Sequence, residues 1–550
     1  MKLKQLTLSI IATLSLGAQA QDLSTEVVVD RTIEPLQRAA SRLSGLTPAL
    51  VLPSTEPISL PVERFTSLSP LTRSYSGLSP IGGAFAPEKT PWRGYASLGY
   101  FYKLNIDASA GYRFIDDSTR VLGADLQFNS EKYNPINTFR ALHDMQQMAG
   151  RANVYYAWRA DDKSFLTAEA TYKHITQGSV YWENQNINAF EARAGWHSRI
   201  DRVNYALNLE GCFENNGNTL VYDYASYDSF YLLDDLNQIR GHLDASASLA
   251  LNGFSAIGAE LYGDIVNTGH TRQAEATEAW LNHASIGYFG LRPSYYLKYN
   301  GLSANIGLKV EMGINDDPKP HVAPDINLQW VATPQFGAWL RATGGEWLNT
   351  FDRMREITNY QLFNQGLRRS HIDYMIEAGL DFGPFTGFSA GVFGGYAKAG
   401  NWMMMQVGLP FFQAYDIKGY QAGIRLAYDW NWLHAEARGA IAPGKITDAW
   451  ILNRDRAKYV IDFHAEARPI KPLTVGLDYQ LRLDRNCFMG VVREFSLGDV
   501  NLLSVHAAYD INSRFSVFAR GENLLSRRYL YLPYQASQKA TGLVGLNVKF

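Results

Sequence analysis

The stretch Leu473-Thr474-Val475-Gly476-Leu477-Asp478-Tyr479-Gln480-Leu481-Arg482-Leu483-Asp484 decides the fold of this chain. Every odd-numbered residue in it is apolar or aromatic, and every even-numbered residue is polar or glycine. Because successive side chains of a β-strand point to opposite faces of a sheet, the pattern predicts a strand with one apolar and one polar face. The same alternation recurs in the runs 104–114, 203–214, 240–251 and 433–441.

The lengths of these runs and of their connections favour a transmembrane barrel over a soluble sheet. The runs cover about 10 to 14 residues, near the length that a tilted strand needs to cross a bilayer. Short turns alternate with long connections, which is typical of outer-membrane barrels. The short turns are 116–118, 160–162, 252–253, 300–301, 333–334 and 511–513, and the long connections include 132–146, 175–187, 215–236, 267–280, 349–369, 484–499 and 525–539.

We therefore predict an all-β fold, an antiparallel transmembrane β-barrel of about 22 strands (roughly 20–24) formed by residues 92–550. An even number of strands places both ends of the barrel on the periplasmic side. The predicted location is the cell outer membrane of a Gram-negative bacterium, with outer-membrane lipid as the surrounding partner.

Residues 1–20 have the features of a secretory signal peptide, with Lys2 and Lys4 ahead of an apolar stretch and Ala18-Gln19-Ala20 as the cleavage site. We expect the mature chain to begin at Gln21. No later apolar run reaches about 18 residues, so no membrane-spanning helix is expected. Mean hydropathy is −0.20 although aromatic residues make up 13% of the chain. A transmembrane barrel has this composition because only alternate residues face lipid and aromatic girdles mark the interfaces.

The remaining composition excludes several classes of function. A net charge of −2 predicts no nucleic-acid partner. The two cysteines, Cys212 and Cys487, are too few for a disulfide framework, and we expect both to be free or locally buried. The sequence contains no G-x-S-x-G, no H-E-x-x-H and no phosphate-binding glycine loop. We therefore expect no catalytic residues, no cofactor and no enzymatic activity.

The C-terminus carries a possible barrel-assembly signal. Phe550, Val548 and Leu546 lie at two-residue steps with polar or small residues between them. A terminal aromatic preceded by this alternation resembles the signal that the outer-membrane assembly machinery reads. The pattern predicts that machinery as a partner.

The hairpin before this strand carries a family resemblance. Asn523 and Leu524 are followed by Tyr529 and then by the terminal Phe550. This order resembles the last hairpin of TonB-dependent outer-membrane receptors, whose barrels have 22 strands and a plugged lumen. The resemblance implies binding of a solute at the outer loops and its uptake through the lumen.

The chain departs from this family ahead of the barrel. Only residues 21–91 are available for a plug, and this segment is rich in proline and lacks plug-like alternation of strands and helices. We interpret it as an N-terminal arm that occludes the lumen or binds a periplasmic partner. Within it, Thr25-Glu26-Val27-Val28-Val29 resembles the segment with which the family contacts TonB, and strand addition would be its mechanism. The alternative is a simple strand or linker.

A repeat is the most notable group of potential ligands. His434-Ala435-Glu436-Ala437-Arg438 recurs as His464-Ala465-Glu466-Ala467-Arg468. Alternation directs each His, Glu and Arg into the lumen, and the two segments are expected to be neighbouring antiparallel strands. His434, Glu436, His464 and Glu466 are candidate metal ligands near the periplasmic end. The other interpretation is a network of ion pairs.

The polar face of the predicted barrel carries charges of both signs. This mixture argues against a simple ion-selective pore and favours a lattice that braces the wall or holds a plug or solute. The residues expected to point inward include Arg113, Arg151, Glu169, Lys173, Arg193, Glu210, Arg240, Asp244, Arg425, Asp478 and Arg482.

Aromatic and methionine side chains gather in the predicted outer loops, where they would suit sugar rings or a protein partner. The recognition candidates are Tyr222, Tyr224, Tyr227, Tyr231, Trp402, Met403, Met404 and Met405. Alternatively, these residues pack on one another to close the mouth of the barrel, or they lengthen the strands.

Two functions follow from these features. The first is uptake of a solute across the outer membrane, with TonB as a partner. The second is a structural or assembly role in an outer-membrane complex, with a surface lipoprotein as a partner held by the loops.

Overall fold

The structure is a computed structural model, and it describes the chain from residue 92 onward with several gaps. The described residues are 92–550, except for 102–104, 118, 134–144, 178–184, 218, 224–228, 234–235, 271–284, 316–318, 354–368, 406–411, 443–456, 490–492, 533–534 and 538. The predicted signal peptide, the predicted arm and the segment Thr25–Val29 lie outside this part of the chain.

Twenty-two strands form a closed antiparallel barrel, as the sequence predicts. They are β1 (Gly94–Phe101), β2 (Asn105–Asp116), β3 (Arg120–Tyr133), β4 (Met145–Arg159), β5 (Phe165–Gln177), β6 (Gln185–Ile200), β7 (Val203–Gly217), β10 (Leu236–Ala250), β11 (Ser255–His270), β12 (Ser285–Tyr299), β13 (Leu302–Ile314), β14 (Pro320–Thr333), β15 (Phe336–Leu348), β16 (Arg369–Phe385), β17 (Phe388–Met405), β18 (Phe412–Trp430), β19 (Leu433–Ile441), β20 (Ala457–Ile470), β21 (Leu473–Met489), β23 (Val500–Asp510), β24 (Phe515–Glu522) and β27 (Thr541–Lys549).

Short strands also occur in the connections between barrel strands. They are β8 (Thr219–Asp223), β9 (Ser229–Leu233), β22 (Arg493–Ser496), β25 (Leu530–Leu532) and β26 (Gln535–Ala536). One helical turn, residues 351–353, follows β15. Within the described residues, no helix has the length and apolar character needed to span a membrane.

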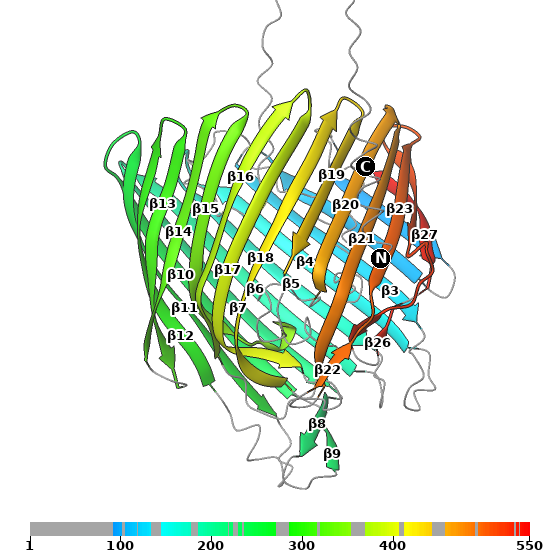
Figure 1. Cartoon of the computed structure of the whole chain (residues 1–550), viewed down its shortest axis with the longest axis horizontal. Coiled ribbons are helices and arrows are strands. Elements are labelled where there is room, and N and C mark those ends of the chain that lie inside the picture. Colours follow the sequence, from blue (N-terminus) through cyan, green and yellow to red (C-terminus); the bar gives the residue numbers. More distant parts are fainter. Residues whose placement is uncertain are drawn as a thin grey trace, which may run out of the picture. The chain divides into compact units, whose positions relative to one another are not determined.

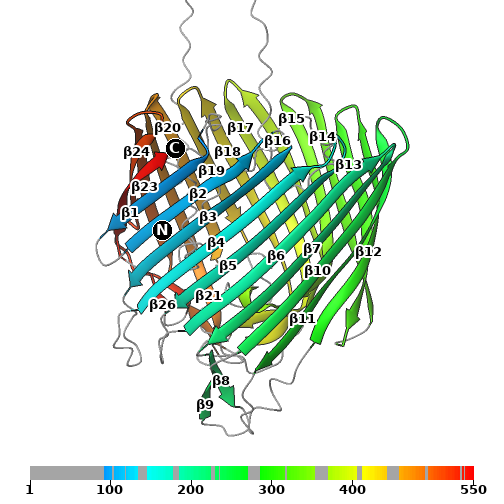
Figure 2. The same ribbon diagram turned by 180° about the vertical axis from the view of Figure 1, so that it is seen from behind.

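The barrel closes because its first strand pairs with its last. Each strand pairs with the preceding one, and β1 pairs with β27 from Tyr95 opposite Lys549 to Tyr100 opposite Val544 (Figures 1 and 2). Two further backbone hydrogen bonds extend this seam, from Gly94 N to Phe550 O at 2.7 Å and from Phe550 N to Gly94 O at 2.9 Å. The terminal residue is thus part of the closure.

The two faces of each strand follow the alternation in the sequence. In β21, Asp478, Gln480 and Arg482 are buried on the inner face, while Tyr479 and Leu481 between them are on the outer face. In β7, Leu207 and Leu209 are exposed on the outer face. An apolar outer face around a polar interior is the arrangement of a transmembrane barrel.

The two ends of the barrel differ in their connections. One end, here called the short-turn end, carries the turns 117–119, 160–164, 201–202, 251–254, 300–301, 334–335, 386–387, 431–432, 471–472 and 511–514, together with the start of β1 and the end of β27. The other end, the long-loop end, carries the remaining connections, of which 102–104, 315–319 and 406–411 are shorter than the rest. The predicted alternation therefore holds with these exceptions.

The wall is not equally high all round. Strands β16, β17 and β18 have 17, 18 and 19 residues, whereas β1 and β24 have 8 each (Figure 1). These strands, like β4, β6 and β7 with 15 or 16 residues, exceed the predicted 10 to 14 residues, and bulges interrupt the period-2 pairing of β16 and β17. One bulge lies between Ala399 and Trp402 in β17. Trp402–Met405 form the end of β17, which corrects their assignment to a loop and agrees with the alternative that they lengthen a strand; their role in recognition remains a prediction.

In four of the short turns, an Asp or Asn side chain accepts hydrogen bonds from the backbone of the turn. Asn512 Oδ1 accepts hydrogen bonds from Arg514 N at 2.8 Å and Phe515 N at 3.0 Å. Asp117, Asp161 and Asn252 accept equivalent backbone hydrogen bonds. Hydrogen bonds from the Thr119 side chain and from the turn backbone lower the pKa of Asp117 to about 2, so its carboxylate remains an acceptor at neutral pH. Asn and Asp favour such turns because their side chains replace a backbone acceptor.

Replacing Asn512 by Ala removes both of these hydrogen bonds from the last short turn. We expect Asn512→Ala to lower the free energy of unfolding by about 1 kcal/mol, as for loss of a helix cap or a single exposed hydrogen bond. Urea unfolding of the barrel in lipid vesicles, followed by tryptophan fluorescence, measures the change. Asn512→Asp is the matched control because it keeps the acceptor oxygen and should remain near the original value. Equal destabilisation by both substitutions would contradict this account of the turn.

Candidate functional site in the barrel lumen

Ion pairs between different strands brace the inner wall. The nitrogen–oxygen distances are 3.3 Å for Arg151–Glu169, 2.5 Å for Lys173–Glu191, 3.0 Å for Arg193–Glu210, 3.5 Å for Arg425–Asp381, 2.6 Å for Arg482–Asp462 and 3.4 Å for Arg520–Asp107, and Arg240–Glu210 and Arg292–Glu260 are also paired. Eight of the eleven charges predicted to point inward take part in these pairs. Because opposite charges neutralise each other along the wall, the lattice gives the described lumen no single sign.

A denser polar group, the lumen network, lies near the long-loop end on β11 and β13 to β16. At its centre the buried Glu311 accepts hydrogen bonds from Tyr262 Oη at 2.6 Å and from the backbone of Glu346 at 2.7 Å. The Glu346 carboxylate lies 3.2 Å from the Arg369 guanidinium. His321 Nε2 lies 3.7 Å from Asp373 Oδ1. Buried charges of this kind are stable only when they are paired.

Two glycines make room for the lumen network. Gly345 has a φ of 124°, and a Cβ there would lie 2.9 Å from the Glu311 carboxylate oxygens. A Cβ on Gly313 would lie only 1.9 to 2.3 Å from Nη2, Cζ and Nη1 of the Arg369 guanidinium. The Arg369 side chain therefore lies flat against the wall over Gly313. The network was missed in the sequence because its members come from separate strands and share no motif.

The chain after β15 turns into the lumen. Phe351 is buried and belongs to an apolar cluster with Leu236, Val266, Ile286, Leu348 and Met403, from β10, β11, β12, β15 and β17. The Phe351 backbone N–H donates to Gln238 Oε1 on β10 at 3.2 Å. Residues 349–353 thus connect β15 to a part of the wall five strands away. This segment is here called the inward turn.

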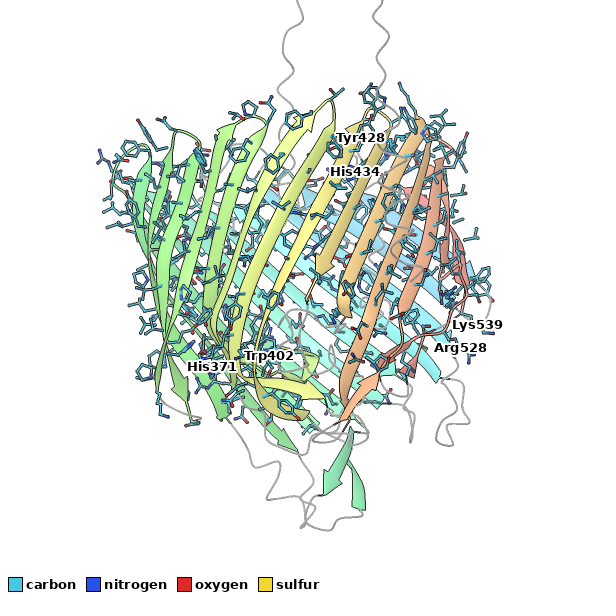
Figure 3. The ribbon with its side chains drawn as sticks, viewed as in Figure 1. His371, Trp402, Tyr428, His434, Arg528 and Lys539 are labelled. Atoms are coloured by element: carbon cyan, nitrogen blue, oxygen red, sulfur yellow. The ribbon has the colours of Figure 1, made fainter. Side chains whose placement is uncertain are left out.

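Polar and aromatic contacts hold both ends of the inward turn. Asn349 Nδ2 donates to Ser370 Oγ at 3.0 Å, and Ser370 Oγ donates to the Asn401 carbonyl at 2.6 Å. The Arg353 guanidinium lies 4.1 Å from the ring centre of Trp347 and 4.7 Å from that of Trp402. Cation–π contacts at such distances contribute about 0.5–1 kcal/mol each at exposed sites. Figure 3 shows Trp402 and His371 together near the long-loop end.

A second connection, the one between β24 and β27, also packs against the inner wall. Tyr529 is buried against Val500 and Leu502, which are on the inner face of β23. Its backbone N–H donates to Ser537 Oγ at 3.1 Å, and Arg485 Nη1 donates to the Leu530 carbonyl at 2.8 Å. In this chain, Tyr529 of the last hairpin is therefore a packing residue. Its role here is to dock the connection.

Asn523, the other end of that motif, shapes the exit from β24. It has a φ of 48° and its Nδ2 donates to the Arg527 carbonyl at 2.8 Å. Asn tolerates this left-handed backbone better than most residues because its short polar side chain bonds locally. The motif residues therefore have structural roles in the described part of the chain.

The repeated His and Glu residues are neighbours, as predicted. His434 lies opposite Glu466, and Glu436 lies opposite His464, in the β19–β20 pair. His464 Nδ1 and Asp478 Oδ1, on β21, are 2.7 Å apart. Within the described residues, no group of three or more His, Cys, Asp and Glu side chains is placed to hold a metal ion. His434 is likewise paired with Asp429, so each histidine of the repeat contacts an aspartate outside it, and both interpretations of the repeat remain predictions.

His506 extends this group toward β23. The ring is buried, and its Nδ1 lies 3.7 Å from Asp478 Oδ2. Asp478 therefore lies between two imidazole rings. A Cβ on Gly476 would lie 2.1 Å from the His506 ring, so this glycine is required by the packing of the imidazole. His434 lies at the short-turn end (Figure 3).

The other predicted residues are distributed as follows. Tyr222 is in β8 and Tyr231 is in β9, which form a separate two-stranded sheet, whereas Tyr224 and Tyr227 lie outside the described residues. Met403 is buried in the apolar cluster, and Met404 and Met405 are the last residues of β17. The thiol of Cys212 is free, as expected. Phe550, Val548 and Leu546 lie at the seam, and their role in assembly remains a prediction.

The protein is thus a large closed barrel in which connections from the long-loop end pack against the inner wall. Solved structures of this fold include the siderophore receptor PirA from Acinetobacter baumannii, with a TM-score of 0.63 and 9% identity over 83% of this chain and 80% of that one. A variant of the ferric enterobactin receptor PfeA from Pseudomonas aeruginosa, in complex with enterobactin, has a TM-score of 0.62 and 10% identity over 83% and 81%.

A third structure is FpvA of P. aeruginosa bound to a heterologous pyoverdine, with a TM-score of 0.60 and 10% identity over 84% of this chain and 72% of that one. These similarities confirm the expected resemblance to TonB-dependent receptors at the level of the barrel fold. No family model and no curated protein sequence matches the chain.

Truncating Phe351 tests whether the inward turn is held by its apolar contacts. We expect Phe351→Ala to weaken docking of the turn by about 3 kcal/mol, the usual cost of removing a buried phenylalanine ring. Trypsin cleavage after Arg353 should then become at least about tenfold faster, while the thermal midpoint of the barrel stays unchanged. Phe190→Ala is the control because Phe190 is half-exposed on the outer face. Unchanged cleavage in Phe351→Ala would show that the turn is held by other contacts.

Proposed function

We propose that this protein is a non-enzymatic outer-membrane receptor of the TonB-dependent type that takes up a solute through its lumen. The inward turn carries the proposal, because it places an apolar cluster and the lumen network beneath the long-loop end of a 22-strand barrel. A ligand that enters from this end meets these groups first. The solved structures of the same fold support the proposal, since they are receptors.

In the proposed mechanism no bond is made or broken. The ligand contacts the long-loop end and displaces the inward turn from Gln238 and from the apolar cluster. The ion-paired wall then offers alternating donors and acceptors along the lumen, so a polar solute can exchange hydrogen bonds with water and wall. The domain arrangement that belongs to this proposal is a signal peptide at 1–20, an arm at 21–91 and the barrel at 92–550.

Conductance across planar bilayers tests the transport proposal. We expect the full chain to conduct weakly, because two connections fold onto the inner wall. Replacing residues 349–353 by five glycines should increase the single-channel conductance severalfold, since Phe351 and Asp352 then no longer contact β10. Phe190→Ala again serves as the control. A sealed barrel in both forms, without binding of any solute, would contradict uptake through the lumen.

The segment Thr25–Val29 is proposed to add as a strand to TonB. We expect Val28→Pro to abolish energy-dependent uptake, because proline removes a backbone donor that strand addition needs. Val28→Thr is the control, since it keeps the backbone N–H and a β-branched side chain. Uptake in cells with and without TonB measures the effect. If Val28→Pro transports as well as the original chain, the segment is a linker.

A structural or assembly role is the second candidate. It is favoured by the β8–β9 hairpin, a separate sheet at the long-loop end in which Tyr222 pairs with Phe230 and Val221 with Tyr231. Such a hairpin could hold a surface lipoprotein. Co-purification of a defined partner that depends on β8–β9 and is unaffected by loss of TonB would support this role over uptake.

A further inference from the structure

Three exposed cations lie together on the connection between β24 and β27. Arg527, Arg528 and Lys539 are all exposed, and no carboxylate among the described residues forms an ion pair with them. The two halves of the connection run side by side, since Ser537 N donates to Tyr529 O at 2.8 Å and Ala540 N to Ser526 Oγ at 3.5 Å. Arg528 and Lys539 are close in Figure 3. These three residues are here called the basic patch.

The short wall at β24 sets the level at which the connection with the basic patch begins. β24 has 8 residues. At a rise of about 3.3 Å per residue and a tilt of about 40°, it ascends only about 20 Å from the short-turn end. The apolar belt of a transmembrane barrel is about 25 Å tall. β24 therefore ends within the belt. The connection continues toward the long-loop end, because Tyr529 packs against Val500 and Leu502, beyond the segment of β23 that pairs with β24.

Leu524, near the start of the connection, lies on the outer face of the barrel, before the chain reaches the inner wall at Tyr529. In β24, Arg520 and Glu522 point inward, so Gly521 is on the outer face. A Cβ on Gly521 would lie 2.9 Å from Leu524 Cδ2, which places Leu524 on that same face. Leu524 and Leu525 are 45% and 42% exposed. They continue the exposed apolar surface that Val544 and Tyr100 form on the neighbouring β27 and β1.

The backbone under the basic patch is held in place by the contacts of Asn523 and Tyr529. Asn523 fixes the carbonyl of Arg527, and Tyr529 is anchored in a buried cluster. The cations are therefore carried on an ordered backbone that ascends from apolar to basic residues. This order matches a lipid molecule, whose acyl chains lie in the belt and whose charged groups lie above it.

We propose that the basic patch binds the phosphate groups of an anionic lipid in the leaflet at the long-loop end, with Leu524 and Leu525 against its acyl chains. Two guanidinium groups favour phosphate because each presents paired N–H donors to its oxygens. The cations, which have no ion-pair partner among the described residues, and the apolar surface next to them carry the proposal. It rests on the membrane location in the proposed function, and it is independent of transport.

Lipid binding by the full chain in non-ionic detergent tests the site. The probe is lipid A with two phosphates, and binding is measured by native mass spectrometry and by titration. The triple variant R527Q/R528Q/K539Q should bind lipid A about 10- to 100-fold more weakly, since each basic residue near a membrane surface contributes severalfold. The control K163Q/R202Q/K471Q has the same change in charge and alters exposed cations at the short-turn end, so it should bind as the original chain does.

Further measurements separate the lipid from other anions and from misfolding. Lipid A without phosphates should bind the original chain as weakly as diphosphorylated lipid A binds the triple variant. Leu525→Ser leaves the cations in place and should weaken lipid binding severalfold, which tests the site even if the triple variant fails to fold. Equal binding of lipid A by the original chain and R527Q/R528Q/K539Q would overturn the proposal. Displacement of bound lipid by millimolar inorganic phosphate would also overturn it, because a free anion would then be the ligand.

Discussion

Closure of the barrel is the constraint on which the other features depend. The hydrocarbon core of a membrane offers no water to unpaired backbone groups, so an open sheet edge there is highly unfavourable. Pairing of β1 with β27, extended by Gly94 and Phe550, removes both edges. Once the ring is closed, the period-2 pattern has only one arrangement that keeps apolar side chains outside. The polar lumen, and any site in it, follows from this arrangement.

The strand number and the facing of the strands were predictable because both depend on local alternation. The pattern from Leu473 to Asp484 is continuous, and its strand was correctly predicted. Prediction failed at bulges, where an extra residue inverts the facing of all that follow. After the bulge between Ala399 and Trp402, the apolar residues of β17 no longer follow the alternation of the preceding part of the strand. The end of β17 therefore resembled a loop in the sequence. Period-2 reasoning carries no information across such a point.

The lumen network and the inward turn depend on contacts that sequence patterns do not contain. Glu311 meets Glu346 and Arg369 because the barrel brings β13, β15 and β16 together, and glycines at Gly313 and Gly345 leave the space. The His434 and His464 repeat was predictable as a neighbouring pair because its strands are consecutive. Phe351 was not, since its partners on β10 to β12 are more than 60 residues away along the chain.

The unequal wall has a consequence for the membrane itself. At β16 to β18 the barrel offers long strands to the bilayer, whereas at the seam of β24, β27 and β1 it offers strands of only 8 or 9 residues. A bilayer adjusts its thickness to the apolar height beside it, at a cost that rises with each ångström of mismatch. For a barrel of this shape in a membrane, the expected consequence is a bilayer that is thinner beside the seam than beside β16 to β18.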